Sequence, residues 1–210
     1  MVLEATTAAS REGVRVPWEK QFDKDAVLER AMHTFWARGY EATSIQDLVR
    51  RTGVNRASLY ATYGDKHALF LASLRMYDEQ RRRRMLAELE ATFAPLEAIR
   101  RLFVAFAKGV DTDKSSPTDG CFLTNTALEL AAKDREAGAI VAKAQLEVEA
   151  FFERMVRQGQ ARGDVATALD ARDTARGLLA SMLGMLVLVR SRPDRALIDG
   201  VIRDVIRRLS

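Results

Sequence analysis

The sequence predicts an all-α fold in which a compact N-terminal unit is followed by a longer helical bundle. Ala, Leu, Arg and Glu are abundant, and these residues have high helix propensity. Apolar residues recur at three- and four-residue intervals, whereas no segment shows the two-residue alternation of a strand. With 48% hydrophobic and 30% charged residues among 210, the composition is typical of an ordinary globular protein.

Three short helices are predicted first. One spans 23–39, from an Asp N-cap to a Gly stop. The next spans 44–53 and begins with a capping box formed by Ser44 and Asp47. The third spans 55–64, again between an Asn cap and a Gly stop.

Longer helices are predicted from residue 65 onward, and the only long loop is 111–120, where Ser, Pro, Thr and Gly interrupt the pattern. No internal repeat is visible. The expected longer helices cover 65–93, 96–110, 122–132, 135–162, 170–190 and 194–209.

The second and third short helices are joined by a tight turn containing Gly53 and therefore predict a helix-turn-helix. Val54 is expected to fill the angle between the helices, and Leu59 and Tyr63 to face inward. The same geometry also occurs in purely structural helical cores. The side chains left outside on the third helix are Arg56, Ala57, Ser58, Tyr60, Ala61 and Thr62.

This exposed set suits the major groove of DNA. It contains no carboxylate, an Arg that could form a bidentate bond to guanine, and Ala residues that could meet a thymine methyl. From Leu48 to Arg84 there are nine Lys or Arg against three Asp or Glu, a larger surplus than the net charge of +4 for the whole chain. Lys66, in the first turn of the next helix, adds a position that favours a phosphate.

Residues 22–70 resemble the DNA-binding domain of the TetR family of transcriptional regulators. The resemblance rests on the "GYEATS" and "TGV" turns, the "LY" pair and the "GDK" followed by "ALF". It implies a homodimer of nine-helix subunits, with a three-helix DNA-binding unit joined to a ligand-binding domain through the fourth helix. The predicted domains are an N-terminal arm over 1–15, the helix-turn-helix unit over 16–64 and a ligand-binding and dimerisation domain over 65–210.

The resemblance also implies DNA contacts. Base or groove contacts fall on the exposed face of the third helix, and phosphate contacts fall on its edges and on the adjoining helix starts. Ala61 stands where relatives often carry a polar residue, so it reads by methyl contact or not at all. The implied set is Thr43, Ser44, Arg56, Ala57, Ser58, Tyr60, Ala61, Thr62 and Lys66.

The implied partners are an operator in double-stranded DNA, a second copy of the chain and a small-molecule effector. The effector would move the fourth helix and release the DNA. A TetR-like activator without a ligand is the alternative. No cofactor is expected, and no catalytic motif or metal site is recognisable, because the two histidines are distant and Cys121 is the one cysteine.

By position, the last two helices resemble the four-helix dimer bundle of the family. The sequence agrees, because small residues line one face of the 170–190 helix; the alternative is a helix buried within one chain. The predicted dimer interface is Leu179, Ala180, Met182, Leu183, Gly184, Leu186, Ile202, Val205 and Ile206.

Aromatic residues and a few polar neighbours are candidates for an effector pocket, although aromatics at helical spacing are more often plain core. Cys121 at a helix start resembles the Gly-Cys of electrophile-sensing relatives, with a buried small hydrophobe as the alternative. The pocket candidates are Phe103, Phe106, Phe122, Asn125, Glu129, Phe151, Phe152 and Met155.

The remaining features predict a cytoplasmic protein without enzymatic activity. The N-terminus lacks the apolar run of a signal peptide, and the longest apolar run, 177–189, is shorter than a bilayer span. The "RRRR" run, Arg81 to Arg84, covers a full helical turn and is expected to be solvated surface.

Overall fold

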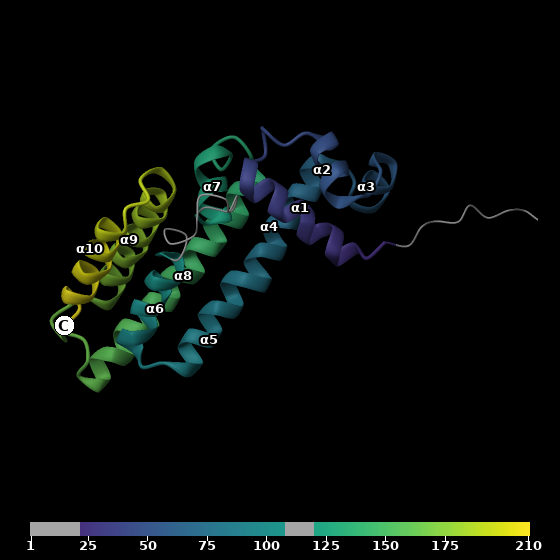
Figure 1. Cartoon of the computed structure of the whole chain (residues 1–210). Coiled ribbons are helices and arrows are strands. Elements are labelled where there is room, and N and C mark those ends of the chain that lie inside the picture. Colours follow the sequence, from purple (N-terminus) through teal and green to yellow (C-terminus); the bar gives the residue numbers. More distant parts are fainter. Residues whose placement is uncertain (1–21, 108–119) are drawn as a thin grey trace, which may run out of the picture.

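The computed structural model describes residues 22–107 and 120–210, and every regular element in those two ranges is helical (Figure 1). The predicted arm over 1–15 lies outside the described residues, as does most of the 111–120 loop.

The N-terminal unit consists of α1 (Lys24–Arg38), α2 (Ile45–Thr52) and α3 (Arg56–Tyr63). All three helices begin and end where their capping residues predicted. The side chain of Asp23 accepts hydrogen bonds at the start of α1, and that of Asn55 does so at the start of α3.

The next helix is one continuous rod made of α4 (Lys66–Tyr77), the π-helical segment η1 (Asp78–Arg83) and α5 (Arg84–Thr92). If this rod is counted once, the described residues contain nine helices, as predicted. The others are α6 (Pro95–Ala107), α7 (Phe122–Glu129), α8 (Arg135–Arg162), α9 (Ala171–Ser191) and α10 (Arg195–Arg207).

The two parts of the molecule share α4. Helix α1 packs on α4 and α2, and the Phe35 and Phe70 rings meet edge to face with 5.2 Å between their centroids. On the other side, α8 lies at the centre of the larger domain and packs against α6, α7 and α9. Figure 1 shows α2 and α3 at one end of the molecule and the α9–α10 pair at the opposite side.

The core of the larger domain contains most of the aromatic residues proposed as pocket lining. Phe151 and Phe152 have no exposed surface, and Phe103 packs on Phe152 with 6.0 Å between ring centroids. Phe122 lies edge-on between Phe70 and Tyr77. These rings are therefore part of the core in this structure, and their role in an effector pocket stays a prediction.

Helix α9 is long and apolar enough to cross a membrane by length and composition, and one third of its most apolar stretch is buried within the protomer. The apolar run 177–189 alone therefore underestimated the length of the apolar helix. Core helices of soluble proteins pass the same test, and α9 packs along α8 and α10 in the helical domain.

Candidate nucleic-acid interface

Local sequence determines how α2 and α3 meet. Ser44 accepts a hydrogen bond from the Asp47 backbone N–H, and the Asp47 carboxylate accepts one from the Ser44 N–H at 3.0 Å, which completes the capping box. Gly53 ends α2 in the left-handed region at φ +74°. Val54 is 8% exposed and Leu59 is 1% exposed, so these two apolar side chains hold α3 against its support.

The outward face of α3 carries the predicted reading residues. Arg56, Ala57 and Ala61 are exposed, while Ser58, Tyr60 and Thr62 are partly exposed. The Arg56 guanidinium lies 5.1 Å from the Tyr60 ring centroid, and it has no ion-pair partner among the described residues. Its N–H donors remain available to an acceptor on DNA.

The edge of this face differs from the prediction at one residue. Thr43 is fully buried, and its hydroxyl donates to the Gly39 carbonyl at 2.6 Å; a phosphate contact by this side chain is therefore a wrong prediction. Ser44 is exposed, but its hydroxyl is occupied in the capping box. Lys66 lies with its Nζ 4.2 Å from the ring centroid of Tyr40, a neighbour that sequence reasoning did not single out.

Next to α3, the Asp47 side chain of α2 forms an ion pair with α1. Its carboxylate pairs with Arg38 at 2.8 Å and also with Arg50. Hydrogen bonds from the Ser44 side chain and backbone, together with the two arginines, lower the pKa of Asp47 from 3.8 to about 2. The carboxylate is therefore ionised at neutral pH and holds the support of the reading helix.

The DNA-binding unit is bound to the larger domain by Glu129. Its carboxylate accepts hydrogen bonds from the backbone N–H groups of Tyr40 at 3.1 Å and Glu41 at 2.9 Å, in the turn between α1 and α2. Gly39 adopts φ +82°, a conformation that favours glycine, and a Cβ at this position would lie 2.7 Å from a Glu129 oxygen and would displace this carboxylate. Glu129 is thus a link between the domains and not a pocket anchor, which corrects the prediction.

A second link joins α4 to the start of α8. His67 Nε2 lies 2.6 Å from Asp134 Oδ2. Backbone hydrogen bonds from Ala137 and Glu136, and the neighbouring His67, lower the pKa of Asp134 despite some desolvation. A movement of α7 or α8 relative to α4 would therefore reach the DNA-binding unit through two polar contacts.

Two cavities lie along the α4–η1–α5 rod, one of them also bordered by Trp36 of α1, and both are bordered by Phe106 and Cys121. Of the predicted pocket residues, only Phe106 lines them. Asn125 lies beside Gly120, which borders the second cavity. Met155 is 1% exposed and belongs to the core. Cys121 is 6% exposed, and the Tyr77 hydroxyl donates to its Sγ at 3.5 Å.

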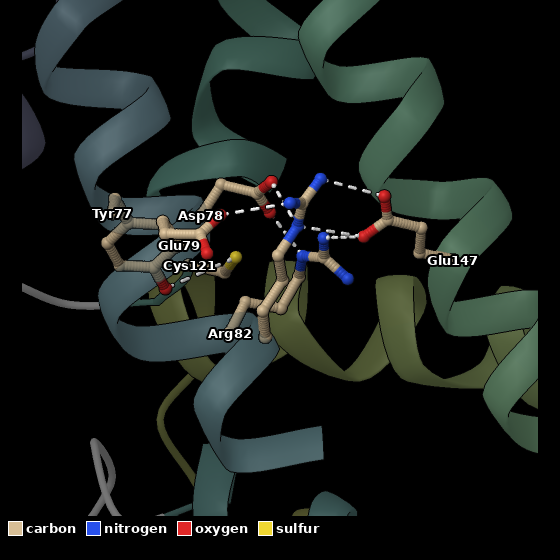
Figure 2. A network of polar contacts seen from close by, with 7 residues as sticks. Tyr77, Asp78, Glu79, Arg82, Cys121 and Glu147 are labelled. Atoms are coloured by element: carbon tan, nitrogen blue, oxygen red, sulfur yellow. Dashed lines mark hydrogen bonds and ion pairs between the residues drawn. The ribbon is translucent and has the colours of Figure 1, made fainter. Parts of the chain in front are cut away.

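Arg82 is the largest departure from the sequence interpretation. It is buried between the carboxylates of Asp78 and Glu147 (Figure 2), and it does not belong to the solvated surface expected of the "RRRR" run. Burial lowers the pKa of Arg82, but the two carboxylates more than offset this, so the net shift is upward. Because η1 is π-helical, residue i lies near both i+4 and i+5. This spacing brings Arg82 and Arg83 to Asp78 together.

The predicted dimer face is only partly exposed. Ala180 and Gly184 lie on the surface of α9, and Leu179, Leu183 and Ile206 are partly exposed. The others pack mainly inside the protomer, although Val205 also borders a surface groove between α9 and α10. The buried residues are Met182, Leu186, Ile202 and Val205, each between 2% and 8% exposed.

The exposed stripe instead combines the small residues of α9 with α10. A surface groove between these helices is bordered by Ser181, Gly184, Leu188, Gly200 and Val201, among others. Within residues 22–107 and 120–210, no group of three His, Cys, Asp or Glu side chains is placed to hold a metal ion.

A presented α3 without carboxylates, supported by α2 and backed by a helical domain with internal cavities, defines a helix-turn-helix DNA-binding protein. Family models assign both parts. Residues 27–73 match the bacterial regulatory proteins of the tetR family, and residues 95–205 match the tetracyclin repressor-like C-terminal domain. The chain belongs to the TetR family of transcriptional regulators.

Individual relatives agree with this assignment. The chain is 33% identical over 180 residues to the uncharacterized HTH-type transcriptional regulator YezE of Bacillus subtilis, covering 83% of this chain and 90% of that protein. It is 32% identical over 171 residues to the HTH-type transcriptional repressor ComR of Escherichia coli, covering 81% of each.

Among solved structures, the TetR family regulator CifR, in a cysteine mutant complexed with operator DNA, superposes with a TM-score of 0.74 at 27% identity. The superposition covers 91% of this chain and 98% of that one.

Proposed function

We propose that the protein is a repressor that binds a palindromic operator as a homodimer in the cytoplasm and leaves it when a small molecule binds the larger domain. The observation that carries this proposal is the outward face of α3, on which an Arg56 without an ion pair stands among small and hydroxylated side chains. It is also supported by the similarity to ComR, a transcriptional repressor, and to CifR, whose structure contains operator DNA.

The homodimer is supported by the stripe of small residues on α9 and α10. Glycines at 177 and 184 have no side-chain neighbour within 4 Å of an added Cβ, so a partner helix could approach them closely. Each copy would then present one α3, and a two-fold axis would place the pair on successive major-groove segments of one DNA face.

The effector response is supported by the α4–η1–α5 rod, which connects the cavities to the end of the molecule that carries α3. Tyr77 and Arg82 on the α4–η1–α5 rod border the second cavity, and the same rod begins at Lys66 beside α3. The coupling needed for release is about 1–3 kcal/mol, which a small shift of this rod could supply by changing the spacing of the two reading helices.

The experiment that tests operator binding is selection of duplexes from a random DNA pool at near-physiological salt, followed by sequencing. An enriched palindrome supports the dimeric reader and supplies the operator for effector screening. A bound pool with no common motif would leave only sequence-independent electrostatic attachment and would overturn the proposal.

The dimer is tested separately by sedimentation of Gly184→Trp, with Gln158→Trp on the exposed surface of α8 as the matched control. We expect the first variant to sediment as a monomer and the second as a dimer. Equal sedimentation of both variants as dimers would exclude the α9 stripe as the interface.

A second candidate trigger is covalent modification of Cys121, because its thiol borders both cavities and receives the Tyr77 hydroxyl. Burial raises the pKa of Tyr77 well above its ordinary value, so the phenol stays protonated as a donor. If Cys121→Ser still leaves the operator normally on treatment with an oxidant or an electrophile, this trigger is excluded.

A further inference from the structure

The two cavities of the larger domain share three residues, Arg82, Phe106 and Cys121. The first has a volume of about 30 Å³ and is bordered mainly by apolar side chains of α5, α6, α7, α8 and α9. The second, about 230 Å³, is bordered by Trp36, Tyr77 and Met85 among others. Their size is below the ~300–1,000 Å³ of ordinary ligand pockets, so an occupant of this conformation is small.

Unpartnered polar atoms gather around these cavities. Among the described residues, three buried side-chain atoms have no hydrogen-bond partner: Trp36 Nε1, Arg82 Nη1 and Asn125 Nδ2. Trp36 and Arg82 border the second cavity, and Asn125 lies beside Gly120 at its wall. All three atoms are donors. Since buried N–H groups are nearly always paired with protein or with an ordered molecule, their occurrence at one place suits an occupant that brings an acceptor.

The Arg82 side chain is the most deeply buried of the three, at 5% exposed. Its Nε donates to Asp78 and its Nη2 to Glu147, which fixes the plane of the guanidinium and leaves only Nη1 unused. Figure 2 shows this guanidinium held between the two carboxylates, close to the pair of Tyr77 and Cys121.

Charge balance defines the acceptor. Asp78, Glu79 and Glu147 carry three negative charges. Arg82 and Arg83, which are paired with them, and Arg81, which borders the second cavity, carry three positive charges. This cluster is already neutral. A carboxylate ligand would add an uncompensated charge to a buried site, which is costly, whereas a carbonyl oxygen would satisfy the donor without adding charge.

We propose that the two adjacent cavities bind a small, uncharged and mainly apolar compound whose carbonyl oxygen accepts a hydrogen bond from Arg82 Nη1, with Trp36 Nε1 as the second donor. The inference rests on the proposed function in that it names the chemical class of the effector. Phe106 and Met85 supply the apolar walls on which the rest of the compound packs.

The test uses two matched series of probes and the full chain without DNA. The series are acetophenone, ethylbenzene and benzoate, and cyclohexanone, methylcyclohexane and cyclohexanecarboxylate. Binding is followed by the NMR methyl signals of Met85 and Leu86, which line the second and the first cavity, respectively. We expect the ketones to shift these signals at concentrations roughly tenfold or more below those needed for the hydrocarbon or the carboxylate.

Three variants sharpen the result. Trp36→Phe keeps a ring but removes one donor, and it should weaken ketone binding without affecting the hydrocarbon. Arg82→Lys keeps the charge facing Asp78 but removes Nη1, and it should remove the preference for ketones. Ala105→Leu should fill the second cavity, with Ala161→Leu on the surface of α8 as the matched control. Ala105→Leu keeps the test decisive if the Arg82 variant does not fold.

The proposal is overturned if no ketone shifts the methyl signals, if the hydrocarbon or carboxylate binds as well as the ketone, or if Ala105→Leu binds ketones normally. These failures differ from a failure of the proposed function. A ketone that binds here but leaves operator affinity unchanged would refute effector release and keep the site. Release by a compound that does not shift these signals would keep the regulator and refute the site.

Discussion

The DNA-binding unit and the larger domain place their polar side chains in opposite ways. Around α2 and α3, the charged groups lie at helix caps or face outward, with Arg56 exposed and Asp47 completing a cap. In the larger domain the decisive polar groups, Arg82 and Asp78, point inward and are almost fully buried. The exposed face of α3 follows from the geometry of one helix, whereas the interior cavities are assembled from several helices.

The largest expected effect of a single substitution lies in the interior. Arg82→Met would leave the carboxylates of Asp78 and Glu147 without their buried partner, and breaking such a pair costs about 3–5 kcal/mol. We expect the free energy of unfolding in urea to fall by that amount. The control is Arg84→Met, which changes an exposed neighbour. Equal loss in both variants would mean that the buried cluster contributes nothing specific.

On the exterior, Arg56→Ala should lower operator affinity and leave the free energy of unfolding almost unchanged. We expect a loss of operator binding of about 1–3 kcal/mol, because a bidentate contact to a base is removed. The free energy of unfolding should stay within about 0.5 kcal/mol, since the side chain is exposed. Electrophoretic mobility shift and urea unfolding measure the two quantities, with Arg162→Ala at the end of α8 as control. A lower free energy of unfolding for Arg56→Ala would contradict the expectation that this exposed residue contributes little to stability.

Between the regions, Glu129→Gln tests the link. The neutral amide would weaken the hydrogen bonds to Tyr40 and Glu41 by about 1 kcal/mol. Hydrogen exchange at the amides of residues 40 and 41 should therefore become faster, while exchange in the core of α8 stays unchanged. Glu88→Gln, on the exposed side of α5, serves as the control and should leave both rates unaltered.

The smallest effect concerns acid stability of the DNA-binding unit. The pKa of Asp47 is lowered to about 2 in the folded protein from an ordinary value of 3.8. Its contribution to stability is therefore fully present above about pH 4 and is lost as pH falls towards 2. In Asp47→Asn this part of the pH dependence should disappear, and thermal melting of both proteins between pH 5 and 2 would show it. Parallel curves would exclude Asp47 as the titrating group.

The same contrast explains which features could be predicted from the sequence. The ends of α1, α2 and α3 were predicted because Asp23, Ser44 and Asn55 act on backbone groups a few residues away. The polar contacts inside the larger domain could not be predicted from such local signals. The burial of Arg82 depends on a π-helical segment that has no signal in the apolar period.

The dimer prediction shows the same limit on a helix surface. Met182 and Gly184 are only two positions apart, yet the first packs on α8 and borders a cavity while the second is exposed. Sequence spacing identified an apolar face and a small-residue face on α9, but only the packing of α8 determines which of them turns outward. The predicted phosphate contact of Thr43 was wrong for a related reason. Its hydroxyl donates a hydrogen bond to the Gly39 carbonyl, which sequence spacing does not show.

The π-helical segment η1 also determines how the helices that follow it are rotated relative to α1 to α3. Each residue of an α-helix turns the chain by about 100°, so removing one residue from η1 would rotate everything after Arg83 by roughly that amount relative to α1 to α3. The length of this segment therefore sets the rotational phase between α3 and the helices that follow Arg83. A one-residue change in the middle of the rod would redirect these helices without changing a residue of α3.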